Sequence, residues 1–279
     1  MLRTRLAAAA PILLVLLLLA PATGQKPNGG QFRNVELCNG ASLPVTRIEA
    51  CSAFIEAGRG GPSSLAIAYN NRGIAYAAKA DYDRAVADFE SAIAIDPAFV
   101  KAINNRGATR LNKGEYDAAI EDFDRAIGLQ PAYANAFANR AEAWLKKGDY
   151  ARAESDYAAA TRLNADMEGA WSGLCWIRAV TGDPQAAMQA CDKAIGAGAH
   201  TASTYDSRAL AHLKAGRADA AIADYDAALR IDPKLANALY GRGLAKLRRG
   251  KSSSGEEDIA AAKALRIDIA EEFARYGVQ

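Results

Sequence analysis

A pattern of small, aromatic and proline residues recurs every 34 residues through most of this chain. The segment YNNRG at 69–73 returns as INNRG at 103–107 and as FANRA at 137–141. Further copies start at positions 168, 202 and 236; the first five run in register without a gap, and the sixth, at 236–269, loosens toward its end. A fixed period of this length predicts stacked supersecondary units, each burying its apolar face against its neighbours.

Each copy has the pattern of two antiparallel helices. Turn signals such as KADYD, KGEYD and TGDPQ stand near the middle of a copy, and apolar residues recur at helical spacing on either side. Position 8 of a copy is small and position 24 is aromatic, as in Gly73 and Phe89, so the two helices can approach closely there. The alanine-rich composition favours the same all-α class.

This pattern resembles the tetratricopeptide repeat, a helix–turn–helix unit of 34 residues. The anchor residues of the first copy are Tyr69, Gly73, Tyr76, Ala85, Phe89, Ala92 and Pro97. The resemblance implies an all-α, right-handed α-solenoid of about six repeats with a partial N-terminal capping repeat. It also implies that the first helices line a concave groove, which in this family commonly binds peptides or protein segments.

The register divides the chain into consecutive units. Residues 44–58 align with 184–198, a second helix, so the array is expected to start with a half-copy. ALRID at 264–268 follows its counterpart by 36 residues instead of 34, which suggests a second helix of different length in the sixth copy. The predicted units are a signal peptide at 1–22, a flexible lead-in at 23–43, a capping repeat at 44–65, repeats at 66–99, 100–133, 134–167, 168–201, 202–235 and 236–269, and a terminal cap at 270–279.

The N-terminal residues have the pattern of an export signal. Arg3 and Arg5 precede an apolar run over 6–20, and Ala20-Pro21-Ala22 is a small-x-small cleavage site, with Ala22-Thr23-Gly24 as a second candidate. The run is shorter than the about 20 residues that cross a bilayer. We therefore expect a cleaved, periplasmic or secreted chain without membrane insertion; the alternative is an inner-membrane anchor formed by 6–20.

The charge balance bears on the class of partner. Residues 1–22 hold two of the 34 basic residues and no acid, so cleavage leaves 32 bases against 32 acids. A balanced chain has no general electrostatic reason to bind nucleic acid or anionic lipid. We expect a protein or peptide segment as partner, and no nucleic acid.

Arginine and aspartate recur together at positions 7 and 23, which are equidistant from the turn. Both are missing from the fourth copy, which has Leu174 and Ala190 instead. A guanidinium–carboxylate pair can form across each hairpin, and a ligand contact by the arginines would not explain the aspartates. The predicted structural ion pairs are Arg72 with Asp88, Arg106 with Asp122, Arg140 with Asp156, Arg208 with Asp224, and Arg242 with Asp258.

The four cysteines suggest two disulfides. Cys175 and Cys191 occupy positions 8 and 24 of the fourth copy, which must touch, so an exported protein would bridge them. Cys38 and Cys51 are the remaining pair and could tie the lead-in to the capping helix. With two histidines and no Cys-x-x-Cys, we expect neither a metal site nor a cofactor.

Asn71, Asn105 and Asn139 all stand at position 6, which the resemblance places on the concave side with positions 2, 5, 9, 12 and 13. In peptide-binding members of the family, asparagines there grip the main chain of the ligand. A carboxamide carries the donors and the acceptor that such contacts need. The alternative is a small polar residue on a wet surface.

Three further residues are candidate partner contacts. Lys101 at position 2 and Lys146 at position 13 could favour an acidic partner segment, or complement a helix dipole. Trp176 at position 9 could be an exposed anchor, or a packed core residue.

The sequence contains no pattern of a hydrolase, a P-loop or a zinc protease. His200 and His212 fit a loop and a packing position, so we expect no enzymatic activity. The favoured interpretation is an exported adaptor or scaffold of the tetratricopeptide repeat type. The alternative is a structural envelope module that self-associates into a homo-oligomer, with no ligand in its groove.

Overall fold

The computed structural model describes residues 35–40, 43–58 and 60–278. Within these residues every regular element is a helix, and no strand occurs. The helix hairpins are α3 (Pro62–Ala78) with α4 (Tyr82–Ile95), α5 (Val100–Lys113) with α6 (Tyr116–Leu129), α7 (Ala134–Lys146) with α8 (Tyr150–Leu163), α9 (Glu168–Thr181) with α10 (Pro184–Gly196), α11 (Ala202–Lys214) with α12 (Ala218–Ile231), and α13 (Ala236–Arg248) with α14 (Ser252–Leu265). α2 (Pro44–Ala57) precedes them and α15 (Ile269–Arg275) follows.

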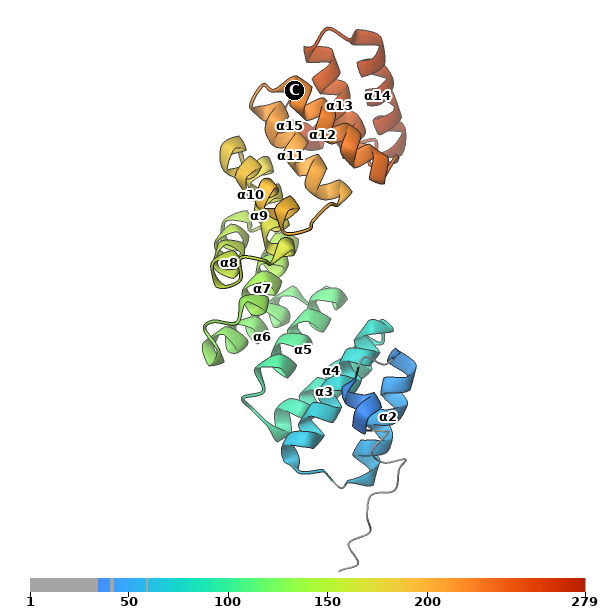
Figure 1. The fold of residues 1–279 in the computed structure, drawn as a ribbon, viewed down its shortest axis with the longest axis vertical. Helices are drawn as coiled ribbons and strands as arrows, with labels where there is room; N and C mark the ends of the chain where they lie inside the picture. The colour runs from blue at the N-terminus through green and yellow to red at the C-terminus, as the bar shows by residue number, and fades with distance from the viewer. Residues whose placement is uncertain (1–34, 41–42, 59, 279) are drawn as a thin grey trace, which may run out of the picture.

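The hairpins stack into a solenoid (Figure 1). Each helix contacts its partner in the hairpin and the first helix of the next hairpin. In Figure 1 the array bends, with α8 and α10 on the outer side and α7 and α9 on the inner side. The all-α solenoid predicted from the 34-residue period is therefore confirmed.

The helix bounds correct one sequence inference about the sixth copy. α12 ends at Ile231 and α14 ends at Leu265, so the 34-residue register holds through the last hairpin. Ala262 is fully buried, as is Ala228 one period earlier. The helix keeps its length because these alanines pack at the same height, although the ALRID segments stand 36 residues apart.

The start of the array also differs from the prediction. Residues 35–39 are helical and Cys38 is buried against α2, so residues 35–40 are not the flexible lead-in that was expected. The disulfide Cys38–Cys51, with Cα atoms 4.8 Å apart, ties this segment to α2. α3 begins at Pro62, before the predicted start of the first repeat, because proline suits the first turn of a helix. The predicted signal peptide lies outside the described residues.

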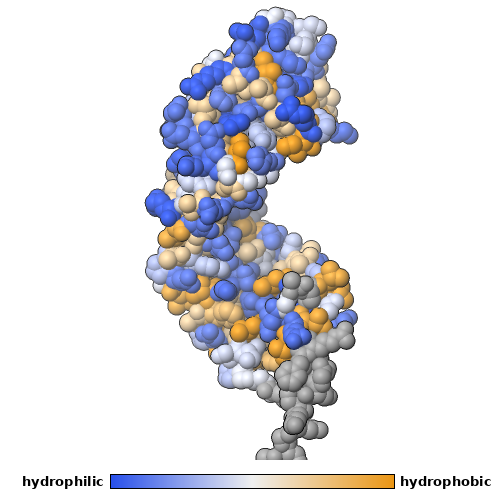
Figure 2. All heavy atoms as spheres, viewed as in Figure 1, coloured by the Kyte–Doolittle hydropathy of each residue, from blue (hydrophilic) through white to orange (hydrophobic). Residues whose placement is uncertain are grey.

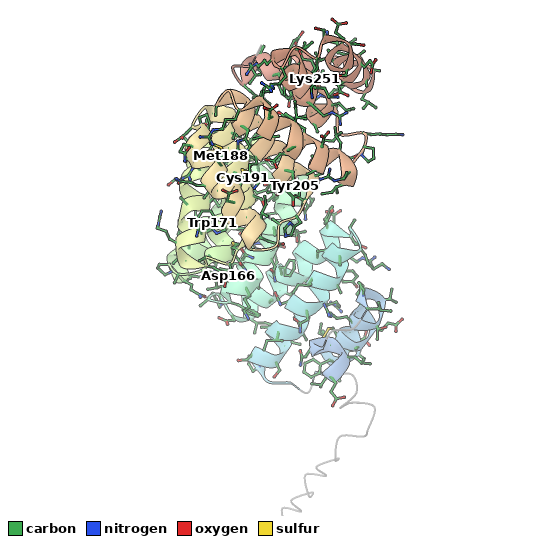
Figure 3. The ribbon with its side chains drawn as sticks, turned by 45° about the horizontal axis from the view of Figure 1, so that its top comes forward. Asp166, Trp171, Met188, Cys191, Tyr205 and Lys251 are labelled. Atoms are coloured by element: carbon green, nitrogen blue, oxygen red, sulfur yellow. A yellow bond between two sulfur atoms is a disulfide. The ribbon has the colours of Figure 1, made fainter. Side chains whose placement is uncertain are left out.

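A second disulfide lies inside the fourth hairpin. Cys175 on α9 and Cys191 on α10 have Cα atoms 4.8 Å apart, and both are fully buried. Cys191 is labelled in Figure 3. The bridge stands where the other hairpins pack a small residue against a larger side chain. In the described residues no cysteine is free.

Each of the five arginines at position 7 lies against the aspartate 16 residues later. Its Nε and Nη2 atoms donate to both carboxylate oxygens, with N–O distances of 2.6–3.0 Å. All five aspartates are buried. The pairs are therefore bidentate and shielded from water, the geometry in which such a pair is strongest.

The arginines also reach the preceding hairpin, a link that sequence reasoning missed. The Nη1 atom of Arg140 lies 2.5 Å from Asp124, and that of Arg208 lies 2.8 Å from Asp192. Arg242 does the same with Asp226 at 2.7 Å. The signal was an acid at position 25, which stands in four copies as Glu90, Asp124, Asp192 and Asp226; the third copy has Ala158 there, and the copy after it lacks the arginine.

We predict energetic coupling between Arg140 and Asp156. Each of Arg140→Leu and Asp156→Ala should lower the free energy of unfolding by about 3 kcal/mol. Arg140→Leu leaves Asp156 as a buried carboxylate without its arginine, and Asp156→Ala leaves the mostly buried Arg140 with only its exposed partner Asp124. The double variant should be less destabilised than the sum by about 1–3 kcal/mol. Chemical denaturation followed by circular dichroism measures this.

Asp124→Ala is the matched control, since it removes the more exposed partner of the same arginine. It should change the free energy of unfolding by at most about 1 kcal/mol. Strictly additive effects of Arg140→Leu and Asp156→Ala would contradict a structural pair.

Candidate partner-binding groove

The first helices line one continuous face on the inner side of the bend. At the centre of this face is a hollow of about 660 Å³ between α7, α9 and α11. Most of its lining residues stand at position 9, 12 or 13 of the third copy or at position 2, 5, 6 or 9 of the next two copies; the others are Tyr157, at position 24, and Thr204, at position 3. In Figure 2 the molecule is indented on this side. At the centre of the array, positions expected on the concave side therefore line a common hollow.

The asparagines at position 6 bond to asparagines at position 5 of the preceding copy. Asn105 Nδ2 donates to Asn70 Oδ1 at 3.0 Å, and Asn139 Nδ2 donates to Asn104 Oδ1 at 3.0 Å. Asn70 and Asn104 are each only 5% exposed, so these bonds satisfy acceptors that water reaches poorly. The position-6 asparagines thus help to join successive first helices, a role that the sequence did not suggest.

Asn105 and Asn139 keep hydrogen-bonding groups that no described residue engages. Each carboxamide offers two N–H donors and one acceptor, and the bond to the preceding copy uses a single N–H. Asn71 is different, because its Nδ2 donates to Asn39 and its Oδ1 accepts from Asn70. The row of three similar asparagines is therefore two equivalent side chains and one that is engaged on both sides.

The row of position-6 asparagines ends at the fourth copy, where the aromatic ring at position 24 of the preceding copy packs in a different place. Phe89 and Phe123 pack against the glycine at position 8 of their own copy: a Cβ on Gly73 or Gly107 would lie 2.8 or 2.7 Å from the ring. Tyr157 and Tyr225 face an alanine there instead, which leaves no such space.

The two tyrosine rings occupy position 6 of the following copy. A Cβ on Gly173 would lie 2.4 Å from the Tyr157 ring, and a Cβ on Gly241 would lie 2.2 Å from the Tyr225 ring. A separation under about 3.0 Å cannot be accommodated without movement. Position 6 is glycine in these two copies because the ring fills the place of the asparagine.

The ring shift changes the chemistry of the groove from one half to the other. Tyr157 lines the central hollow, and its hydroxyl donates to Glu142 Oε2 at 2.9 Å. Burial, and next the charge of Glu142, raise the pKa of Tyr157, so the hydroxyl stays protonated. The groove presents carboxamides over α5 and α7, and then a phenol, glycines and serines over α9 and α11.

The structure places the other predicted contacts as follows. Lys101 is exposed at the start of α5. Lys146 lines the hollow and is half exposed, with its Nζ 3.1 Å from Glu142. Trp176 also lines the hollow, and its ring meets the ring of Tyr150 edge to face at 5.6 Å between centroids. Trp176 is therefore packed on one side and open to the groove on the other.

Bases at position 13 of later copies have a structural role. Lys214 Nζ donates to the carbonyl oxygens of Ala179 and Val180 at 2.9 and 3.1 Å, at the end of the preceding first helix. Arg248 Nη1 donates to Leu213 O at 2.8 Å in the same way. These bonds satisfy carbonyls that the helix end leaves without partners.

The described residues contain no group of three or more His, Cys, Asp or Glu side chains arranged to hold a metal ion. His212 Nε2 lies 3.6 Å from the structural Asp224, and His200 Nδ1 lies 2.9 Å from the hydroxyl of Tyr205. In Figure 3, Trp171 lies beside the loop that holds Asp166. Its Nε1 donates to Ala165 O at 2.8 Å, so this ring packs a repeat junction.

We predict that position 6 of the fourth copy does not accept asparagine. Gly173→Asn should lower the free energy of unfolding by about 1–3 kcal/mol, because its Cβ meets the Tyr157 ring. Adding Ala141→Gly and Tyr157→Phe rebuilds the arrangement of the second copy and should restore most of the loss. Chemical denaturation measures both effects.

Gly169→Asn is the control, because it makes the same substitution in α9 where no atom lies within 4 Å of the added Cβ. It should leave stability unchanged or slightly higher, since asparagine is a better helix former than glycine. Equal losses for Gly173→Asn and Gly169→Asn would contradict the ring-placement argument.

Comparison with known proteins identifies the repeat. Models described as "Tetratricopeptide repeat" match residues 66–99, 100–133 and 139–201, and one described as "TPR repeat" matches residues 209–250. No curated protein has a matching sequence.

Several solved structures share the fold. PilF of Pseudomonas aeruginosa is 17% identical, with a TM-score of 0.66 over 77% of this chain and 99% of its own. Cut9–Hcn1, an APC/C hetero-tetramer, is 17% identical with a TM-score of 0.64, over 84% of this chain and 48% of its own. YrrB, described as a TPR protein with an unusual peptide-binding site, is 17% identical with a TM-score of 0.57, over 68% of this chain and 98% of its own. The matched repeats and the shared fold show that this chain belongs to the tetratricopeptide repeat family.

Proposed function

We propose that this chain is an exported adaptor that binds an extended peptide or partner segment in its concave groove. Tetratricopeptide repeats make it a protein–protein interaction scaffold. The observation that carries the groove proposal is the pair Asn105 and Asn139, each with an unused donor and acceptor on the same face. YrrB supports it as a similar fold with a peptide-binding site.

The spacing of these carboxamides suits an extended main chain. Neighbouring packed helices lie about 8–10 Å apart, and a strand advances about 3.3 Å per residue. Asn105 and Asn139 would therefore meet every third peptide unit of a segment that runs along the groove. Main-chain contacts of this kind tolerate many sequences, so side-chain selectivity would come from the hollow beside Trp176.

Two disulfides support export. Both cysteine pairs are bridged, and such bonds persist in oxidising compartments such as the periplasm and are rare in a reducing cytosol. Among the described residues, no helix has the length and apolar character to cross a membrane.

We predict that groove asparagines control peptide binding. A random peptide library displayed on phage and selected on the chain should yield binders. Asn105→Ala with Asn139→Ala should weaken the selected peptides at least tenfold, since each lost hydrogen bond is worth about 0.5–1.5 kcal/mol. Fluorescence anisotropy with the synthetic peptides measures the affinity.

The control is Asn70→Ala with Asn104→Ala, which removes the same two intramolecular bonds but keeps both groove carboxamides. This control should retain the peptide affinity of the unmodified chain, and its melting temperature should be similar to that of the Asn105→Ala, Asn139→Ala variant. Equal loss in the two double variants would assign the asparagines to helix stacking alone. A library without binders would contradict groove binding and favour the self-associating module, which light scattering would then detect as an oligomer.

Export predicts a specific mass for the chain expressed from its own start in a bacterium. The periplasmic fraction should hold a chain that begins at residue 23 or 25, four hydrogens lighter than its reduced form because both disulfides are closed. Intact-mass spectrometry before and after reduction measures this. A cytoplasmic chain of full mass with free thiols would contradict export.

A further inference from the structure

α15 and the residues after it, which fall in the predicted terminal cap at 270–279 and at its border, are anchored by apolar side chains. Ile269 is 0%, Phe273 2% and Val278 2% exposed. The Phe273 ring lies 4.9 Å from the ring of Tyr240 on α13 and 6.0 Å from the ring of Tyr276. The opposite side of this short helix, with Glu271 and Arg275, faces solvent.

α15 docks on the groove face. Its contacts on α13 are Asn237 and Tyr240, which stand at positions 2 and 5 of the sixth copy. The same positions line the central hollow in the fourth copy, as Gly169 and Ser172. In Figure 1, α15 accordingly lies beside α11 and α13 and not beyond α14. The segment covers the part of the groove that continues from the hollow.

Glu272 is the polar centre of this docking contact. Its Oε1 accepts from Asn237 Nδ2 at 3.2 Å and from the Tyr276 hydroxyl at 2.7 Å, and its Oε2 accepts from Arg266 Nη2 at 2.6 Å. The Glu272 carboxylate is therefore held by one amide of the groove, that of Asn237, and by the guanidinium of Arg266 in the loop between α14 and α15; an aromatic side chain follows it in sequence. This pair, Glu272 and Phe273, has the form of a ligand motif.

A buried carboxylate, that of Asp206, lies near Glu272 and makes the docked arrangement less favourable. Asp206, at position 5 of α11, has an Oδ1 atom that is enclosed and has no hydrogen-bond partner. Burial is the main cause that raises the pKa of Asp206 to about 7, and the negative charge of Glu272 adds to it. The positive charge of Arg266 acts in the opposite direction. The Tyr225 hydroxyl of α12, in the same neighbourhood, is also buried without a partner. Ionised Asp206 opposes the docking of Glu272, and this repulsion makes undocking easier.

We propose that the segment from Ile269 to Val278 is a displaceable occupant of the groove over α11 and α13, and that the partner segment bound there carries the same acidic–aromatic pair. The inference rests on the proposed function of the groove. The carboxylate of the partner would take the place of Glu272 on Asn237 and Arg266, and its aromatic ring would stack on Tyr240.

The probe is a labelled peptide with the sequence of residues 266–278, RIDIAEEFARYGV. Phe273→Ala in the full chain releases the resident segment, so the peptide should bind this variant at least tenfold more tightly than the unmodified chain. Asp206→Asn, at pH 8, should have the opposite effect, because it removes the repulsion that opposes docking. A peptide with Gln and Ala in place of the Glu–Phe pair is the matched control and should not bind.

Hydrogen exchange of the unmodified chain provides an independent measurement. The amides of α15 should exchange at least tenfold faster than those of α13 and α14, because the segment undocks while the hairpin stays folded. Equal protection of α15 and α13 would make the segment an integral cap and overturn the proposal. So would equal peptide affinity for the unmodified and Phe273→Ala chains.

These outcomes are distinct from those for the groove as a whole. If library peptides bind through Asn105 and Asn139 while the Glu–Phe peptide binds no variant, the inference about α15 fails and the proposed function stands. If neither kind of peptide binds, both fail.

Discussion

Successive hairpins in this protein can stack closely only where the side chain at position 24 finds space between two helices. In the first two copies the space is a glycine at position 8 of the same hairpin, and Phe89 and Phe123 fill it. In the third and fifth copies it is a glycine at position 6 of the next hairpin, filled by Tyr157 and Tyr225. Because interiors are close-packed, moving the glycine moves the ring, and the ring decides what the groove presents.

The arginines at position 7 link each hairpin that carries one to the hairpin before it. A single guanidinium joins its own hairpin through the aspartate at position 23, and the previous second helix through the acid at position 25, as Arg140 does with Asp156 and Asp124. The fourth hairpin has no such arginine and carries the Cys175–Cys191 bridge instead. A covalent link inside the hairpin thus stands where the ionic link is missing, and Arg208 of the next copy still reaches back to Asp192.

These two constraints divide the groove into functional regions. Over α5 and α7 it carries carboxamides that are partly used by the stacking itself. At the centre it carries a hollow with Trp176, Tyr157 and the Glu142–Lys146 pair. Over α11 and α13 it is covered by α15. A bound segment that extends along the whole groove would have to compete with the chain's own Glu272 and Phe273.

The period and the family resemblance were sufficient for the fold class. The period alone was sufficient for the pairing of positions 7 with 23 and of Cys175 with Cys191, because both depend on heights within one hairpin. A local hairpin has one geometry, and its contacts lie 16 residues apart in the sequence. Relations between hairpins could not be read in this way. The bonds from Asn105 to Asn70, the acids at position 25 and the return of α15 onto the groove depend on how successive units rotate against each other. That rotation is set by the packing of rings and glycines in three dimensions, so the tertiary structure alone decided which asparagines remain available and which part of the groove is already filled.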